Sequence, residues 1–177
     1  MALTRIGVLI AYLLTFTLGA GADEPAMPPS LRTFESPHGK IRVLSDPTKG
    51  TDVIEVATGK LLWHMAGWFE NLYVLDDGEH LASVWGGFNL IPLDAPDSFT
   101  MIWFWEHGRE TRSVSLSEIV PDRSILIRTV SHYAWGNFAG IDERDRLVVV
   151  PNDKKAILFS MADGQKISGD DVPKLPN

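Results

Sequence analysis

Apolar and polar residues alternate along most of this chain in short stretches that end in turn residues. Residues 72–86 show the pattern most clearly, with the sequence Leu-Tyr-Val-Leu-Asp-Asp-Gly-Glu-His-Leu-Ala-Ser-Val-Trp-Gly. Asp77-Gly78 predicts a tight turn, because glycine accepts a positive φ and aspartate tolerates the position before it. The residues on both sides favour strands. The stretch therefore predicts a hairpin, and weaker copies occur at residues 36–40 and 142–146.

The strands and turns group into three units, at about residues 36–68, 72–116 and 129–167. Each unit passes through turn, strand, loop, strand, glycine turn and strand, a rhythm typical of β-propeller blades. One helix of one or two turns is expected near residues 117–120, since Ser115 and Glu118 fit a capping pattern and Pro121 disfavours its continuation. The predicted fold is mainly β, a single domain of antiparallel propeller-like strand units. A two-sheet β-sandwich is the alternative.

Residues 101–105 form the strongest predicted strand, with the sequence Met-Ile-Trp-Phe-Trp. A strand with one face in water carries a polar residue at every second position, and this strand carries none. We therefore expect a central strand that is covered on both faces, with Trp103 as a buried structural residue.

The N-terminal segment differs from the rest of the chain. Residues 1–22 contain a single charge, Arg5, followed by an apolar run and by Ala20-Gly21-Ala22. This order is typical of a secretory signal peptide, and the apolar run is shorter than the about 20 residues that span a bilayer. We expect cleavage after Ala22 and a periplasmic or secreted protein; an uncleaved anchor is the alternative. A flexible leader (residues 23–30), a β domain (31–168) and a loose tail (169–177) should follow.

Charge and cysteine content exclude several classes of function. The chain of 177 residues has a formal net charge of −7, which becomes −8 when Arg5 is lost with the signal peptide. An acidic chain without a basic run is a poor candidate for binding nucleic acid or an anionic membrane. The absence of cysteine excludes disulfides, thiol catalysis and thiolate metal sites. No second apolar run approaches spanning length, so we expect no membrane span after cleavage.

The candidate catalytic and metal-binding residues are sparse. The five histidines show neither the His-x-His nor the His-x-x-x-His spacing of a metal site, so neither a metal nor another cofactor is expected. Asp76, Asp77 and His80 can be drawn as a carboxylate–imidazole group. The same residues are common at hairpin tips, and turn chemistry is the favoured interpretation. Glycine-rich phosphate loops and Gly-x-Ser-x-Gly are absent, so no catalytic residue is assigned.

The six tryptophans are the least ordinary feature of the composition. All lie in or beside predicted strands, where each can bury on the order of 200 Å² in a core. Some of them can instead line an exposed platform for a sugar or a peptide. Trp85 and Trp135 are the candidates for exposure, because glycines follow both and Phe88 and Phe138 lie three residues beyond. Trp85, Phe88, Trp135 and Phe138 are therefore the candidate ligand-binding residues.

Four short pieces carry a resemblance to a known group of proteins. They are Ser-Pro-His-Gly-Lys at residues 36–40, Leu-Leu-Trp at 61–63, Leu-Asp-Asp-Gly-Glu-His-Leu at 75–81 and Ser-Val-Ser-Leu-Ser-Glu-Ile at 113–119. In these pieces the chain resembles uncharacterised exported bacterial proteins with short β-propeller-like repeats. The resemblance implies a fold and no activity. Three units fall short of the about four to eight blades of a closed propeller, so a partly open arrangement is expected.

The sequence is compatible with three functions. The leading hypothesis is an exported, soluble, non-enzymatic protein that binds another protein or a cell-envelope component. The second is a carbohydrate-binding module that holds an envelope polysaccharide on an aromatic platform. The third is a hydrolase with an unrecognised site around Asp76, Asp77 and His80.

Overall fold

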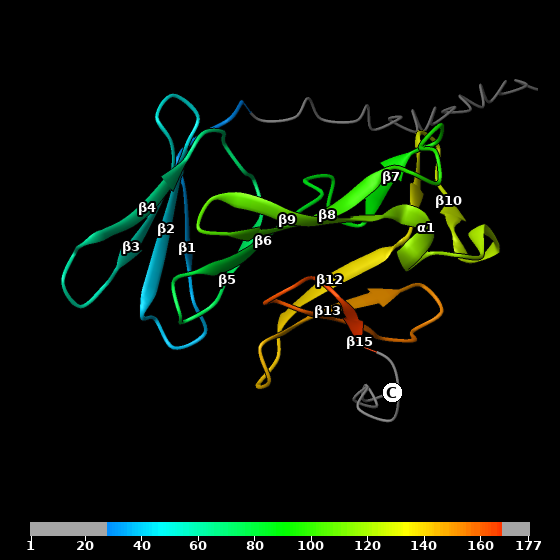
Figure 1. Ribbon diagram of the computed structural model, residues 1–177. Helices are drawn as coiled ribbons and strands as arrows, with labels where there is room; N and C mark the ends of the chain where they lie inside the picture. The colour runs from blue at the N-terminus through cyan, green and yellow to red at the C-terminus, as the bar shows by residue number, and fades with distance from the viewer. Residues whose placement is uncertain (1–27, 168–177) are drawn as a thin grey trace, which may run out of the picture.

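The computed structural model describes residues 28–167, and nearly all of their regular structure is antiparallel β-sheet (Figure 1). Sheet A contains β1 (Arg32–Glu35), β2 (Ile41–Asp46), β3 (Gly50–Glu55) and β4 (Leu61–Met65). Sheet B contains β5 (Leu72–Val74), β6 (His80–Val84), β8 (Thr100–Glu106) and β9 (Arg109–Ser115). Sheet D contains β12 (Gly136–Ile141), β13 (Arg146–Pro151), β14 (Ile157–Ser160) and β15 (Lys166–Ile167). Each of the three sheets has four strands paired in chain order, which confirms the expected propeller-like units.

The connections between sheets B and D form a smaller unit. Sheet C contains β10 (Ile127–Arg128), β11 (His132–Ala134) and β7 (Leu90–Pro92), which belongs to the insertion between β6 and β8. A single-turn helix, α1 (Leu116–Ile119), and a 3₁₀ turn, Arg123–Ile125, lie between β9 and β10 in the chain. The short helix confirms the expectation from the capping pattern. The third unit begins later than expected, because residues 132–134 pair with the insertion instead of with β13.

Sheet B lies in the middle of the molecule, and its two faces pack on different neighbours. Leu72, Val74 and Leu81 join residues of sheet A in one apolar core. Ala82 and Phe104 point the other way, into the larger core that contains buried residues of sheet D. β8 is an inner strand of this sheet, between β6 and β9, so the prediction of a central strand is confirmed. A two-sheet sandwich is wrong, because sheet B is packed on both sides.

Sheets A and D lie on opposite sides of sheet B, so the described strands form an open arrangement (Figure 1). The face of sheet A that points away from sheet B carries charged pairs. Arg42 binds Glu35 across strands at 2.8 Å, and His64 lies 2.7 Å from Asp52. A terminal repeat of a stacked array needs a polar outer face of this kind. The described chain is therefore a single, partly open, propeller-like domain.

The aspartates of the predicted hairpin tips organise the turns themselves. Asp77 Oδ1 accepts hydrogen bonds from the backbone N–H groups of Glu79 at 2.8 Å and of His80 at 3.1 Å. Asp142 does the same for Arg144 at 2.9 Å and Arg146 at 3.1 Å. These bonds satisfy backbone donors at the tip, which is the usual role of aspartate in turns.

Asp76 connects the first hairpins of sheets A and B. Its carboxylate accepts hydrogen bonds from Ser36 Oγ at 2.5 Å and from the His38 backbone N–H at 3.3 Å, and His38 Nδ1 lies 2.5 Å from its second oxygen. Burial opposes ionisation of this carboxyl, but the contacts with Ser36 and His38 outweigh burial and lower its pKa to about 2. Two turn motifs that lie 40 residues apart in the chain are therefore joined by one ionised side chain.

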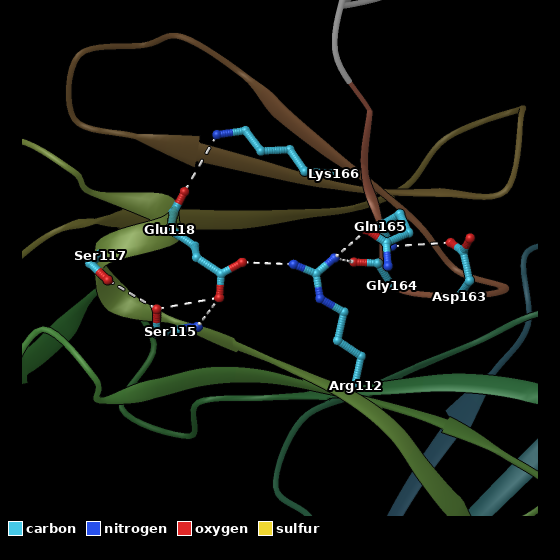
Figure 2. A network of polar contacts seen from close by, with 8 residues as sticks. All are labelled: Arg112, Ser115, Ser117, Glu118, Asp163, Gly164, Gln165 and Lys166. Carbon is cyan, nitrogen blue, oxygen red and sulfur yellow. Dashed lines mark hydrogen bonds and ion pairs between the residues drawn. The ribbon is translucent and has the colours of Figure 1, made fainter.

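Arg112 connects sheet B to sheet D (Figure 2). Its guanidinium donates to the carbonyl oxygen of Gly164 at 2.5 Å and to Glu118 Oε2 at 2.7 Å. Glu118 Oε1 accepts from the backbone N–H of Ser115 at 3.0 Å, which completes the expected cap of α1. The planar fork of arginine allows one side chain to bind a helix cap and the turn between β14 and β15 together.

Three of the predicted segments lie wholly or mostly beyond the described residues. The signal peptide of residues 1–22, most of the leader and the tail of residues 169–177 lie outside the described residues. Regular structure begins at Arg32 and continues to Ile167.

Candidate functional site

A hollow of about 420 Å³ lies on the face of sheet B that points towards sheet A. We call it the aromatic hollow. Its walls come from the segment between β4 and β5, from β6 and the residues after it, and from β8 and β9. They are Trp68, Phe69, Glu70, Ser83, Val84, Trp85, Gly86, Trp103, Trp105 and Glu110. Four of the six tryptophans thus meet at one place, in a hollow of the size that binds small ligands or single side chains.

Strand register explains why the hollow forms beside Trp103. In sheet B the residues opposite Trp103 are Ser83 on β6 and Ser113 on β9. Neither serine is large enough to pack over the indole, whereas Trp105 lies opposite Leu81 and packs against the core shared with sheet A. Trp103 is therefore only partly buried. The prediction that Trp103 is a fully buried residue is wrong for this reason.

Most of the aromatic rings in the hollow are held by hydrogen bonds at their edges. Trp105 Nε1 donates to Ser83 Oγ at 3.0 Å, and Phe69 meets the Trp105 ring edge to face at 5.6 Å between centroids. Trp68 Nε1 donates to the carbonyl oxygen of Ser30 at 2.7 Å. Within residues 28–167 we find no hydrogen-bond partner for Trp103 Nε1. This N–H is available to a ligand.

Two carboxylates border the aromatic rings, and no lysine or arginine lines the hollow among the described residues. Glu70 Oε1 forms an ion pair with the guanidinium of Arg32 at 3.6 Å, which is longer than a hydrogen bond, and the Glu70 side chain is 34% exposed. The second oxygen of Glu70 lies over Gly86, where a Cβ atom would meet it at 2.6 Å. Glu110 is exposed at the rim. The hollow is therefore aromatic, and its unpaired negative charge comes from Glu110.

A second hollow of about 260 Å³ adjoins the first and shares Val84 and Trp85 with it. We call it the side hollow. It is lined by Asn71, Tyr73, Val84, Trp85, Phe88, Asn89, Asn137 and Phe138. The Trp85 ring is fixed between the two hollows, because its Nε1 donates to the carbonyl oxygen of Leu90 at 2.8 Å and its face meets the edge of Phe99 at 4.7 Å.

The four residues expected to bind a ligand come together, but not all at the surface. Trp85, Phe88 and Phe138 line the side hollow. Trp135 is completely buried, so its expected exposure is wrong. The glycine after it does not make room for a ligand, because the backbone of Val150 and Pro151 occupies the space where a Gly136 side chain would lie. Close packing of β12 on β13 thus buries the indole.

Trp135 supports the loop that carries Phe88. Its Nε1 donates to the carbonyl oxygen of Phe88 at 2.9 Å, and its ring contacts Phe138 at 4.9 Å between centroids. Phe88 has a φ of 54°, which is uncommon for a residue with a side chain, and it is 64% exposed. A large apolar ring held at the surface in a strained backbone conformation is typical of a binding site.

The carboxylates proposed for a hydrolase serve the fold. Burial raises the pKa of Asp77 while its hydrogen bonds to His80 and Glu79 lower it more, and the pKa of Asp76 is about 2. A general acid needs the opposite shift. Ser36, His38 and Asp76 also form no catalytic triad, because the serine and the histidine both bind the carboxylate. Within residues 28–167 no hydrogen bond joins Ser36 Oγ to the His38 ring.

The described chain also bears on metal binding and on membrane insertion. Residues 28–167 hold no group of three or more histidines and carboxylates that could bind a metal ion. In the same part of the chain no helix has the length and apolar character required to cross a membrane.

Sequence reasoning missed most of the aromatic hollow. Trp68 lies at the end of the first predicted unit and Phe69 and Glu70 lie between it and the second, and nothing in their spacing placed them against β8. The available signal was composition, since two aromatic residues in a polar connection are unusual. Trp103 was assigned to a core because its cross-strand neighbours, Ser83 and Ser113, were not known.

Comparison with known proteins finds solved structures that align with parts of this chain. No protein-family model matches the sequence, and a search of curated proteins finds no match. The structure of U3-55K aligns with 78% of this chain at 13% identity and a TM-score of 0.42, and the RRP9 WD40 repeats align with 81% at 13% identity and a TM-score of 0.42. KlHsv2 with loop 6CD replaced by a Gly-Ser linker aligns with 79% at 16% identity and a TM-score of 0.44. The chain covers 38%, 40% and 38% of these proteins, respectively, so it spans less than half of each.

Proposed function

We propose that this is an exported, non-enzymatic binding protein that recognises a partner protein through the aromatic surface formed by the two hollows. The observation that carries the proposal is the exposed Phe88 in the side hollow with the partly buried ring of Trp85, which also lines the aromatic hollow with Trp103. Large aromatic residues supply most of the energy at protein interfaces, because they bury much area and lose little conformational freedom. The backbone of Phe88 is held by the hydrogen bond from Trp135 Nε1 to its carbonyl oxygen, which reduces the entropic cost of ordering this loop on binding.

The roles of the polar residues support a non-enzymatic function. Asp76, Asp77 and Asp142, the carboxylates of the hairpin tips, all accept hydrogen bonds within the fold. Their pKa values are lowered. The segment of residues 1–22 has the composition of a signal peptide, and this supports export to the periplasm or the medium.

Binding of an envelope polysaccharide is the second candidate. Indole rings stack on sugar rings, and the aromatic hollow adds carboxylates and one unpaired indole N–H that can bind hydroxyl groups. The exposed phenylalanine favours a protein instead, because a strongly apolar ring offers a sugar no hydrogen bond.

Photo-crosslinking in the native cells tests the proposal. Benzoylphenylalanine replaces Phe88 in one variant and Leu61 in a control variant; both natural residues are exposed, at 64% and 51%, and Leu61 lies on β4 of sheet A. We expect light-dependent protein adducts from position 88 and none from position 61. Removing the Trp85 ring by Trp85→Ala should abolish the adducts. Equal labelling from both positions, or none from position 88, contradicts protein recognition by this surface. Polysaccharide adducts at position 88 instead support the second candidate.

A further inference from the structure

We propose that the aromatic hollow binds the guanidinium group of an arginine side chain on the partner protein. This inference rests on the proposed function, and it names the group that is recognised. The indole faces of Trp68, Trp103 and Trp105 would contact the guanidinium, and Glu70 and Glu110 would supply the opposite charge.

The walls of the hollow suit a flat cation. Aromatic faces are negative, and a guanidinium within about 6 Å of a ring centroid is attracted to them, most strongly to tryptophan. Three indoles and one phenyl ring line the hollow besides Trp85. Arginine is planar and weakly hydrated, so it stacks on rings more readily than the compact ammonium group of lysine. A volume of about 420 Å³ admits one long side chain together with part of its backbone.

The charge of the hollow selects a cation over a neutral ligand. Within the described chain, Glu70 and Glu110 are the charged residues that line it; Glu70 Oε1 forms an ion pair with Arg32 at 3.6 Å, whereas Glu110 has no ion pair among residues 28–167. The Glu110 carboxylate and Glu70 Oε2 are therefore available for charge-assisted hydrogen bonds with a guanidinium. The net charge of −7 favours a basic partner at longer range as well.

The unpaired N–H of Trp103 favours a peptide over a small cation as the ligand. A guanidinium or a quaternary ammonium has no acceptor for this donor. The backbone carbonyl groups that flank an arginine in a polypeptide can accept it. The hollow thus offers rings and carboxylates to the guanidinium and an N–H donor to the backbone of an arginine within a protein chain.

Calorimetric titration of the purified protein tests the inference. The probe is the peptide acetyl-Gly-Arg-Gly-amide, and its matched controls carry citrulline, which has the same shape without the charge, or lysine. We expect saturable binding of the arginine peptide and about tenfold weaker binding of both controls. Glu110→Gln and Trp103→Phe should each weaken binding several-fold, whereas Glu79→Gln, in the exposed turn before β6, should leave it unchanged.

The results of the titration and of the crosslinking test the proposed function and the arginine site separately. Equal binding of the citrulline peptide overturns recognition of the charge, and equal binding of the lysine peptide overturns recognition of the guanidinium. Adducts at position 88 that excess arginine peptide does not reduce would leave the proposed function intact and overturn the arginine site. If the parent protein gives neither adducts at position 88 nor binding of the arginine peptide, the proposed function and the arginine site are both overturned. Circular dichroism of each variant shows that it is folded.

Discussion

Replacing Trp135 by alanine should be among the most destabilising single changes in this protein. The indole is completely buried, packs on Phe138 and donates a hydrogen bond to Phe88. Truncation of a buried tryptophan costs about 3–5 kcal/mol of the free energy of unfolding. That is a large share of the about 5–15 kcal/mol that stabilises a typical domain. At about 2–4 °C per kcal/mol for a chain of this size, the melting temperature should fall by about 6–20 °C.

Two further variants separate burial from hydrogen bonding. Trp135→Phe retains a ring in the core and removes the donor to Phe88, so it should cost about 1–2 kcal/mol. Trp103→Ala removes a partly buried indole that lies in the aromatic hollow, and it should cost about half as much as Trp135→Ala. Urea unfolding is followed by circular dichroism, because loss of an indole changes the fluorescence signal itself.

The order of the two alanine variants is the decisive result. If Trp103→Ala is more destabilising than Trp135→Ala, then Trp103 is the core residue and Trp135 is the exposed one. That outcome would restore the assignment made from the sequence and remove Trp103 from the binding surface. An unchanged urea midpoint for Trp135→Ala would refute the burial argument outright.

Three more predictions concern the contacts between sheets and the N-terminus. Because folding lowers the pKa of Asp76 to about 2, its contribution of about 1–2 kcal/mol is present above pH 4 and is lost as the pH falls through 2. Thermal melts of the parent protein and Asp76→Asn should therefore differ at pH 6 and converge at pH 2; a constant difference contradicts the linkage. Arg112→Ala should cost about 2 kcal/mol by breaking the contact between sheets B and D, and Arg112→Lys should rescue little, as measured by urea unfolding. N-terminal sequencing of the exported protein should begin at Asp23, and an intact Met1 would indicate an uncleaved anchor.

The secondary structure of this protein follows from local sequence. Alternation of apolar residues, aspartate–glycine turns and the Ser115–Glu118 cap act over a few residues, so they can be recognised without knowledge of the fold. The propeller-like strand units and the central position of β8 were predictable for this reason, whereas the fourth strand of each sheet was not part of the repeating pattern. The five apolar residues 101–105 predicted an inner strand, although Trp103 and Trp105 on one face are only partly buried.

The binding surface depends on contacts between residues that are distant in the chain. Trp103 borders a hollow because strand register places Ser83 and Ser113 beside it, and register is set by the pairing of whole strands. Trp135 is buried because β12 approaches β13 at Gly136. The same local pattern, a tryptophan followed by small residues, leaves Trp85 at the surface and buries Trp135. The sequence by itself determined which strands and turns form, whereas their packing decided which aromatic rings are core and which are free to bind.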